Sequence, residues 1–178
     1  MTIYIALLRG INVGGHKVIK MATLKQMFES IGLKQVKTYI QSGNIVFKSE
    51  EDINFLKERI QSGIKNVFGF DVPVMLRTCD EFINMIKSCP YEFDSLLEGE
   101  SIYVAFLANE LSEKEKDQLL MQKNETEVCY IHEKVVYLLF KNSIRNSKLM
   151  NQFQKLQTPV TIRNWRTVNK LKAIVESM

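Results

Sequence analysis

Hydrophobic and polar positions in the first 78 residues follow two periods, one typical of strands and one of helices. Short β-branched and apolar runs predict strands, and apolar residues spaced three and four apart predict amphipathic helices. A tight turn at Ser42-Gly43 predicts a hairpin between two of the strands. The predicted strands cover residues 3–8, 36–41, 45–48 and 72–78, and the predicted helices cover 24–31 and 53–67. The element order is β-α-β-β-α-β.

The same order recurs later in the chain. Strands are predicted at 102–107, 128–131, 135–140 and 159–162, and helices at 112–120 and 149–156. Pairs of Thr or Ser with Glu three residues later, at Thr78-Glu81 and Ser112-Glu115, predict capping boxes at two helix starts. The sequence therefore predicts an α+β fold of two tandem ferredoxin-like repeats with mainly antiparallel sheets. The predicted parts are a first repeat (1–78), a short helix and connector (79–100), a second repeat (101–163) and a C-terminal helix (164–178).

Composition places the chain among ordinary globular proteins. It has 178 residues, of which 46% are hydrophobic and 25% charged, so it can bury a core. No apolar run approaches the roughly 20 residues that cross a bilayer, and the first residues lack the pattern of a secretory signal. Cys79, Cys89 and Cys129 lack motif spacing and are expected to be reduced core residues. These features predict a cytoplasmic protein without a membrane partner.

Charge is distributed unevenly, although the formal net charge is only +4. Residues 1–48 carry seven Lys/Arg against one acidic residue, and residues 141–175 carry eight Lys/Arg and no acidic residue. The segment 49–140 carries 18 Asp/Glu against nine Lys/Arg. A chain that is basic at both ends and acidic in the middle can mark an anionic partner, and a mixed solvated surface is the alternative.

The fold predicts where two polar clusters lie. In a ferredoxin-like unit the loop after the first strand reaches the same sheet edge as the hairpin between the second and third strands. That loop, residues 9–20, is much longer than its counterpart after residue 107, and long loops are often functional. The predicted ligand-binding residues at this edge are Arg9, Asn12, Gly14, Gly15, Gln41, Ser42 and Asn44. The alternative is structural, because a glycine-rich connection and a tight turn need these residue types themselves.

A second cluster is predicted in the second repeat. The segments 142–148 and 163–167 follow two strands that end at the same edge, so the sequence predicts that they lie close together. A helix start among cations suits a phosphate or carboxylate. The predicted ligand-binding residues are Arg145, Ser147, Lys148, Arg163, Asn164 and Trp165. A solvated basic face is the alternative, and Trp165 is also a candidate for packing in the last helix.

The sequence lacks the motifs of several known kinds of catalytic and binding site. The loop at 9–20 is neither a Walker A loop nor G-x-G-x-x-G, and no G-x-S-x-G is present. His16 and His132 have no partner at metal-ligand spacing, so neither a metal site nor a cofactor is predicted. No nucleophile and base can be paired, which leaves open whether the protein is an enzyme, because distant segments can assemble a catalytic site.

The polar motifs resemble those of a bacterial family. The matching segments are residues 7–15, 21–22, 38–44, 147–149 and 161–168. Together they are similar to the signature of the family labelled domain of unknown function 1697, over nearly the whole chain. The resemblance implies a two-repeat ferredoxin-like architecture and implies no activity.

Three functions remain open from the sequence. The first is binding of a phosphate-bearing ligand, with nucleic acid as the leading candidate because both ends of the chain are basic. The second is an enzyme acting on a small phosphorylated or carboxylated metabolite. The third is a protein-interaction module that uses the acidic middle or the final helix. The oligomeric state and the packing of the repeats are not predicted.

Overall fold

The computed structural model describes residues 1–178 and contains two compact units. Unit 1 comprises residues 1–84 and 170–178, and unit 2 comprises residues 85–169. Helices α3 (Cys79–Lys87) and α6 (Trp165–Glu176) each run across a boundary between the units.

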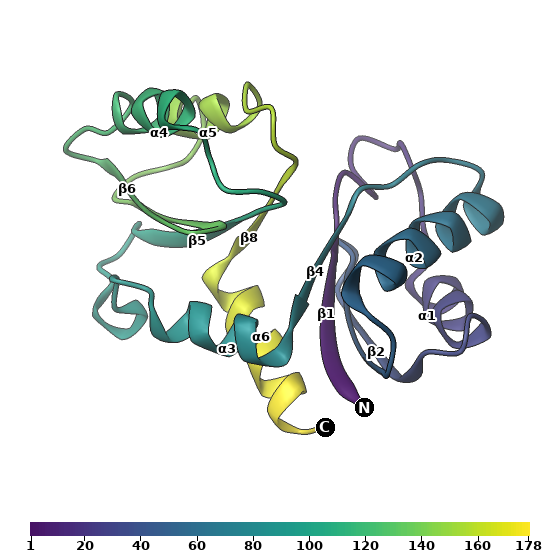
Figure 1. Ribbon diagram of the computed structural model, residues 1–178. Helices are drawn as coiled ribbons and strands as arrows, with labels where there is room; N and C mark the ends of the chain where they lie inside the picture. Colours follow the sequence, from purple (N-terminus) through teal and green to yellow (C-terminus); the bar gives the residue numbers. More distant parts are fainter. The chain divides into compact units, whose positions relative to one another are not determined.

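Unit 1 is built on a four-stranded antiparallel sheet with the strand order β2-β3-β1-β4. Its elements are β1 (Thr2–Leu8), α1 (Met21–Ser30), β2 (Lys34–Tyr39), β3 (Asn44–Ser49), α2 (Ile53–Phe68) and β4 (Val74–Thr78). Helices α1 and α2 cover one face of this sheet (Figure 1), and Phe28 of α1 packs edge-on against Phe47 of β3 at 5.5 Å between ring centroids. Burial of this apolar layer is the main stabilising contribution within the unit.

Unit 2 repeats the same architecture with the strand order β6-β7-β5-β8. Its elements are the 3-10 turn η1 (Phe93–Ser95), β5 (Ser101–Leu107), α4 (Glu113–Leu120), β6 (Glu127–His132), β7 (Val135–Phe140), α5 (Lys148–Phe153) and β8 (Val160–Asn164). Helices α4 and α5 lie on one face of the sheet. The predicted fold class, an α+β protein of two ferredoxin-like repeats with a C-terminal helix, is confirmed.

Most differences from the predicted elements lie at their ends. The helix expected to continue to residue 156 stops at Phe153, because residues 154–159 turn the chain back into β8. The last nine residues, 170–178, group with unit 1, where the Lys37 ammonium donates a 3.2 Å hydrogen bond to the Ser177 hydroxyl.

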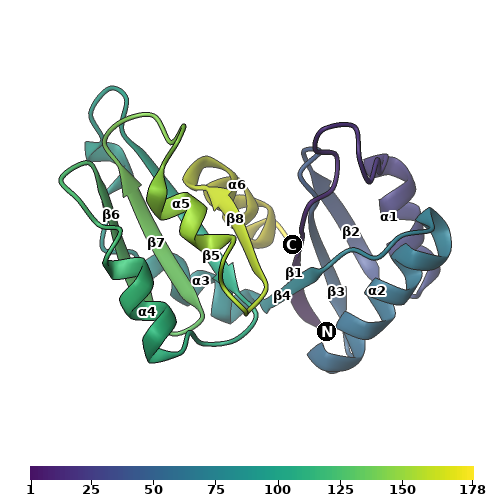
Figure 2. The same ribbon diagram turned by 90° about the horizontal axis from the view of Figure 1, so that it is seen from above.

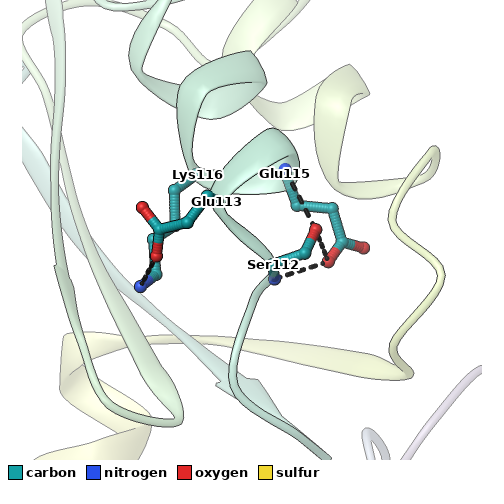
Figure 3. Close-up of polar contacts among 4 residues, drawn as sticks. All are labelled: Ser112, Glu113, Glu115 and Lys116. Atoms are coloured by element: carbon teal, nitrogen blue, oxygen red, sulfur yellow. Dashed lines mark hydrogen bonds and ion pairs between the residues drawn. The ribbon is translucent and has the colours of Figure 1, made fainter.

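Both predicted capping boxes are present. At α4 the Ser112 backbone N–H donates to the Glu115 carboxylate at 3.0 Å, and the Glu115 N–H donates to the Ser112 hydroxyl oxygen at 3.3 Å (Figure 3). The Glu115 carboxylate also accepts from the Gln157 N–H at 3.0 Å, which ties the start of α4 to the turn before β8. Thr78 and Glu81 form the equivalent pair at α3.

The Glu115→Gln variant should show a pH-dependent loss of stability. Hydrogen bonds from the backbone N–H groups of Ser112 and then Gln157 lower the pKa of Glu115. A carboxylate whose pKa is lowered by folding stabilises above its unfolded pKa of about 4.3, and the effect is lost as pH falls through the folded pKa. Because this carboxylate faces solvent, screening limits the difference from the parent to about 0.5 kcal/mol at pH 7. Urea unfolding should show that difference at pH 7 and a smaller one at pH 2.5; an equal difference at both would contradict the assignment.

Candidate functional site

The loop at residues 9–20 joins β1 to α1 and lies against the β2–β3 turn. The Leu8 N–H donates to the Gly43 carbonyl at 2.8 Å, and the Arg9 N–H donates to the Pro73 carbonyl at 3.0 Å. The predicted proximity of the loop and the hairpin turn is therefore confirmed.

Asn12 holds the loop together through its side-chain amide. Its Nδ2 donates to the Ile19 carbonyl at 3.0 Å and to the Gln41 carbonyl at 2.7 Å, and its Oδ1 accepts from the Ile19 N–H at 2.8 Å. The backbone of Asn12 has a φ of +55°, a left-handed conformation that Asn tolerates better than most residues. Asn12 thus ties both ends of the loop to each other and to the turn.

Gly43 allows the turn to pack closely on this loop. A Cβ at Gly43 would lie 2.7 Å from both the Leu8 Cβ and the Ile11 Cδ1, and the φ of +82° also disfavours any larger residue. Glycine is therefore required here on two independent grounds, close contact and backbone conformation.

The remaining predicted residues of the turn are also used in its structure. Asn44 is fully buried, and its Nδ2 donates to the Tyr39 carbonyl and to the Ser42 hydroxyl, both at 2.9 Å. Gln41 is exposed and contributes its main-chain carbonyl to Asn12. Among the predicted ligand-binding residues of this turn, Gln41 is exposed, whereas Ser42 is half-buried and Asn44 is buried.

The outer surface of the loop is cationic. We call residues 9–20 the cationic loop; its ionisable side chains are Arg9, His16, Lys17 and Lys20, all exposed. Lys17 donates to the Asp71 carbonyl at 2.7 Å, and the first acidic residue of the chain is Glu29. Gly14 and Gly15 are exposed at the tip with φ of +59° and +75°. The loop therefore has a backbone that is fixed by hydrogen bonds and a surface that carries exposed positive charge.

In unit 2 the carboxylate of Glu127 binds the start of α5. Ser147 is the N-cap: its hydroxyl accepts from the Met150 N–H at 3.0 Å and donates to Glu127 at 2.9 Å. The Glu127 carboxylate also accepts from the Leu149 N–H at 3.4 Å. Arg145 and Lys148 remain exposed beside it. The Leu149 and Met150 N–H groups at this helix start therefore have partners within the chain.

The two polar segments of unit 2 lie at the same end of the sheet but at opposite edges. The Lys141 N–H donates to the Thr126 carbonyl and so places the loop after β7 beside β6, whereas Asn164 ends β8. Two strands separate β6 from β8, which corresponds to about 14 Å at the usual strand spacing. Their predicted close approach is wrong, because the loop at 141–147 turns outward towards β6.

The segment at Arg163–Trp165 has structural contacts of its own. Arg163 donates to the Ile162 carbonyl at 3.1 Å, and burial lowers its pKa to about 10. Asn164 accepts from the Thr167 N–H at 2.8 Å at the start of α6, and Trp165 is 6% exposed. Arg77 of β4 lies opposite Ile5 of β1, and Arg163 of β8 lies opposite Val104 of β5, so the two arginines occupy equivalent positions in the two repeats.

A cavity of about 500 Å³ lies beside Asn164 and Trp165. Its lining comes from the connector, β5 and the start of α6: Phe93, Leu96, Leu97, Glu98, Gly99, Glu100, Ser101, Ile102, Tyr103, Asn164, Trp165 and Arg166. One cation, Arg166, therefore faces a lining with two glutamates. The connector carries no recognisable motif, so this cavity could not be predicted from the sequence.

The ionisable side chains show no metal-binding cluster. No group of three or more His, Cys, Asp or Glu residues is arranged to hold an ion. The three cysteines are free; Cys129 is buried, whereas Cys79 and Cys89 are half-buried rather than core residues, and burial raises the pKa of each thiol. No helix has the length and apolar character to cross a membrane.

Two ferredoxin-like repeats with a long loop after the first strand define a tandem-repeat α+β protein. Residues 1–137 match the family described as "Protein of unknown function (DUF1697)", and the chain belongs to this family. It is similar to the solved structure of the conserved bacterial protein SP0830 from Streptococcus pneumoniae, with 29% sequence identity, 98% of each chain covered and a TM-score of 0.72. No curated protein matches the sequence. Neither of the two descriptions states an activity.

Proposed function

We propose that the protein binds a phosphate-bearing ligand through the cationic loop, with nucleic acid as the leading candidate. The observation that carries the proposal is the combination of a loop backbone held by Asn12 and Gly43 with exposed positive charge. A backbone that is already ordered loses little conformational entropy on binding, which favours affinity.

The composition of the loop suits phosphate chemistry. Arg9 can donate two parallel hydrogen bonds to phosphate oxygens, and Lys20 adds a mobile point charge. Gly14 and Gly15 lack side chains, so a ligand can approach their backbone N–H groups closely. Because no carboxylate occurs among residues 9–20, the loop itself offers an anion no repulsion.

A polyanion suits a loop with several exposed cations better than a single phosphate does. Arg9, Lys17 and Lys20 are all exposed, and no acidic residue precedes Glu29 in the chain. Nucleic-acid backbones are bound by several dispersed Lys and Arg side chains, each of which contributes to the salt dependence of binding.

Replacing Arg9 or Lys20 by alanine should weaken binding of labelled single-stranded RNA, single-stranded DNA or duplex DNA, whichever the protein binds at physiological salt. The expected loss is about tenfold per variant, and the slope of log affinity against log salt should fall by about 0.7–0.9. Lys114→Ala, which removes an exposed charge from α4, is the matched control and should change the affinity less than twofold.

Fluorescence anisotropy at low and physiological salt measures both quantities, and inorganic pyrophosphate is titrated in parallel. Binding of pyrophosphate alone would assign the loop to a small phosphorylated ligand. Absence of binding to every probe at physiological salt would refute the proposal.

The cavity in unit 2 favours a second candidate, binding or turnover of a small carboxylated metabolite. Its volume of about 500 Å³ suits a small molecule, and Arg166 and Asn164 can bind a carboxylate while Glu98 and Glu100 can accept from an amine. A melting-temperature screen with amino acids and keto acids tests this candidate: stabilisation that is lost in Arg166→Ala would support it, and no stabilisation by any of them would remove it.

A further inference from the structure

Strand β6 forms an edge of the unit 2 sheet and lacks the features that usually prevent edge strands from pairing (Figure 2). The corresponding edge strand of unit 1, β2, has a register shift between Lys34 and Lys37, a left-handed Gln35 and two lysines. β6 pairs with β7 residue by residue from Glu127 to His132 without a shift, and it contains no Lys, Arg, Pro or Gly. β6 is therefore a regular, unprotected edge.

The hydrogen-bond pattern shows which backbone groups point outward from this edge. The Lys141 N–H donates to the Thr126 carbonyl at 2.8 Å, so this pair is hydrogen-bonded. In an antiparallel ladder such pairs alternate, so Cys129 and Ile131 point their N–H and C=O groups away from β7. These four groups make no hydrogen bond within the chain.

At one end of β6 the outward backbone groups already have hydrogen-bond partners within the chain. Asn124 accepts from the Glu127 N–H at 3.0 Å through its side chain and donates its own N–H to the Glu127 carbonyl at 2.9 Å. The outward groups of Glu127 are thus satisfied, and the open part of the edge consists of Cys129 and Ile131.

A groove of about 360 Å³ runs along this open edge beside α4. Its charged lining residues are Glu110, Lys116, Lys123 and Glu133. Lys116 pairs with Glu113 of α4 at 2.8 Å, so Lys123 near Cys129 makes one end of the groove basic, and Glu133 in the turn after β6 makes the other end acidic. Apolar side chains are exposed at and beside it: Leu120 is 44%, Met121 78% and Tyr130 48% exposed.

We infer that a second copy of this chain pairs with β6 in an antiparallel arrangement, about a two-fold axis that passes beside Tyr130. In that register Cys129 of one copy lies opposite Ile131 of the other, and the reverse. Each of these two pairs forms two backbone hydrogen bonds, so all four outward groups of each copy are satisfied. The two four-stranded sheets then form one continuous sheet of eight strands.

Charge complementarity selects a second copy rather than an unrelated strand. Because the two strands run in opposite directions, the basic end of one groove, at Lys123, meets the acidic end of the other, at Glu133. The two Tyr130 side chains meet as a non-hydrogen-bonded pair, in which side chains lie closest. Four backbone hydrogen bonds and one pair of tyrosines form a limited contact, for which we expect a dissociation constant in roughly the micromolar range.

Sedimentation velocity over a concentration series tests this pairing. The parent protein should sediment as a monomer when dilute and as a dimer at about 100 µM. Tyr130→Lys should shift the dissociation constant at least tenfold upward, because two ammonium groups would then face each other at the axis. Val67→Lys, which introduces the same charge at an exposed apolar position of α2, should leave the dimer intact. A parent that stays monomeric at 100 µM, or a dimer insensitive to Tyr130→Lys, would overturn the inference.

Cross-linking tests the register independently of affinity. Opposed side chains of a non-hydrogen-bonded pair lie close enough for a disulfide. In a background with Cys79, Cys89 and Cys129 replaced by serine, Tyr130→Cys should form a covalent dimer on mild oxidation, whereas Val67→Cys should not. Circular dichroism confirms that both variants are folded. A Tyr130→Cys protein that is folded and does not cross-link at 100 µM would contradict the two-fold register.

Discussion

Replacing Gly43 by alanine is expected to lower the free energy of unfolding by about 3 kcal/mol. Two costs add. The left-handed backbone at φ +82° costs a residue with a Cβ about 1 kcal/mol or more. The new Cβ would also lie 2.7 Å from Leu8 and Ile11, and relieving such overpacking typically costs 1–3 kcal/mol.

Gly10→Ala separates these two costs. Gly10 has a similar φ of +70°, but a Cβ there would meet no atom within 4 Å. Gly10→Ala should therefore lose only the backbone contribution of about 1 kcal/mol. Urea unfolding of the two variants measures the difference. Equal losses would show that the close approach of the turn to the loop is not a significant constraint.

Asn12→Ala is expected to cost about 3 kcal/mol. The substitution removes three hydrogen bonds worth about 0.5–1.5 kcal/mol each and leaves the Ile19 N–H without its partner. It also places alanine at φ +55°, which adds about 1 kcal/mol.

Asn12→Gly is the matched control for the backbone contribution. Glycine accepts the left-handed conformation, so this variant should lose only the hydrogen bonds, about 2 kcal/mol. Chemical unfolding gives the losses, and amide hydrogen exchange at Ile19 shows whether the loop opens locally. Unchanged exchange protection at Ile19 in both variants would mean that Asn12 does not hold the loop.

The sequence was sufficient to predict features that depend on local pattern or on topology. The pairs Ser112-Glu115 and Thr78-Glu81 are three residues apart, so their reciprocal hydrogen bonds follow from helix geometry alone. The proximity of the cationic loop to the β2–β3 turn followed from the order of strands in a ferredoxin-like unit.

Contacts between distant side chains could not be predicted. Glu127 reaches the start of α5 from 20 residues earlier in the chain, and no pattern in the sequence links it to Ser147. The sequence also did not indicate that Asn12 would direct its amide to Ile19 and Gln41 rather than outward. The residue types were compatible with both a binding and a structural role, and only the three-dimensional arrangement shows the contacts they make.

These contacts change which residues can bind a ligand. Asn12, Asn44 and Ser147 have partners within the chain, whereas the side chains of Arg9 and Lys20 extend from an ordered backbone into solvent. We therefore place the proposed phosphate recognition on the cationic loop, whose backbone Asn12 holds in place.

Amide chemical shifts of the ¹⁵N-labelled protein, followed during titration with a single-stranded RNA oligonucleotide at physiological salt, test this proposal most directly. We expect the largest shift changes at Gly10, Gly14, Gly15 and His16, and we expect them to diminish in Arg9→Ala. Shift changes confined to unit 2, or none at any concentration of RNA, DNA or pyrophosphate, would contradict the assignment of phosphate binding to the cationic loop.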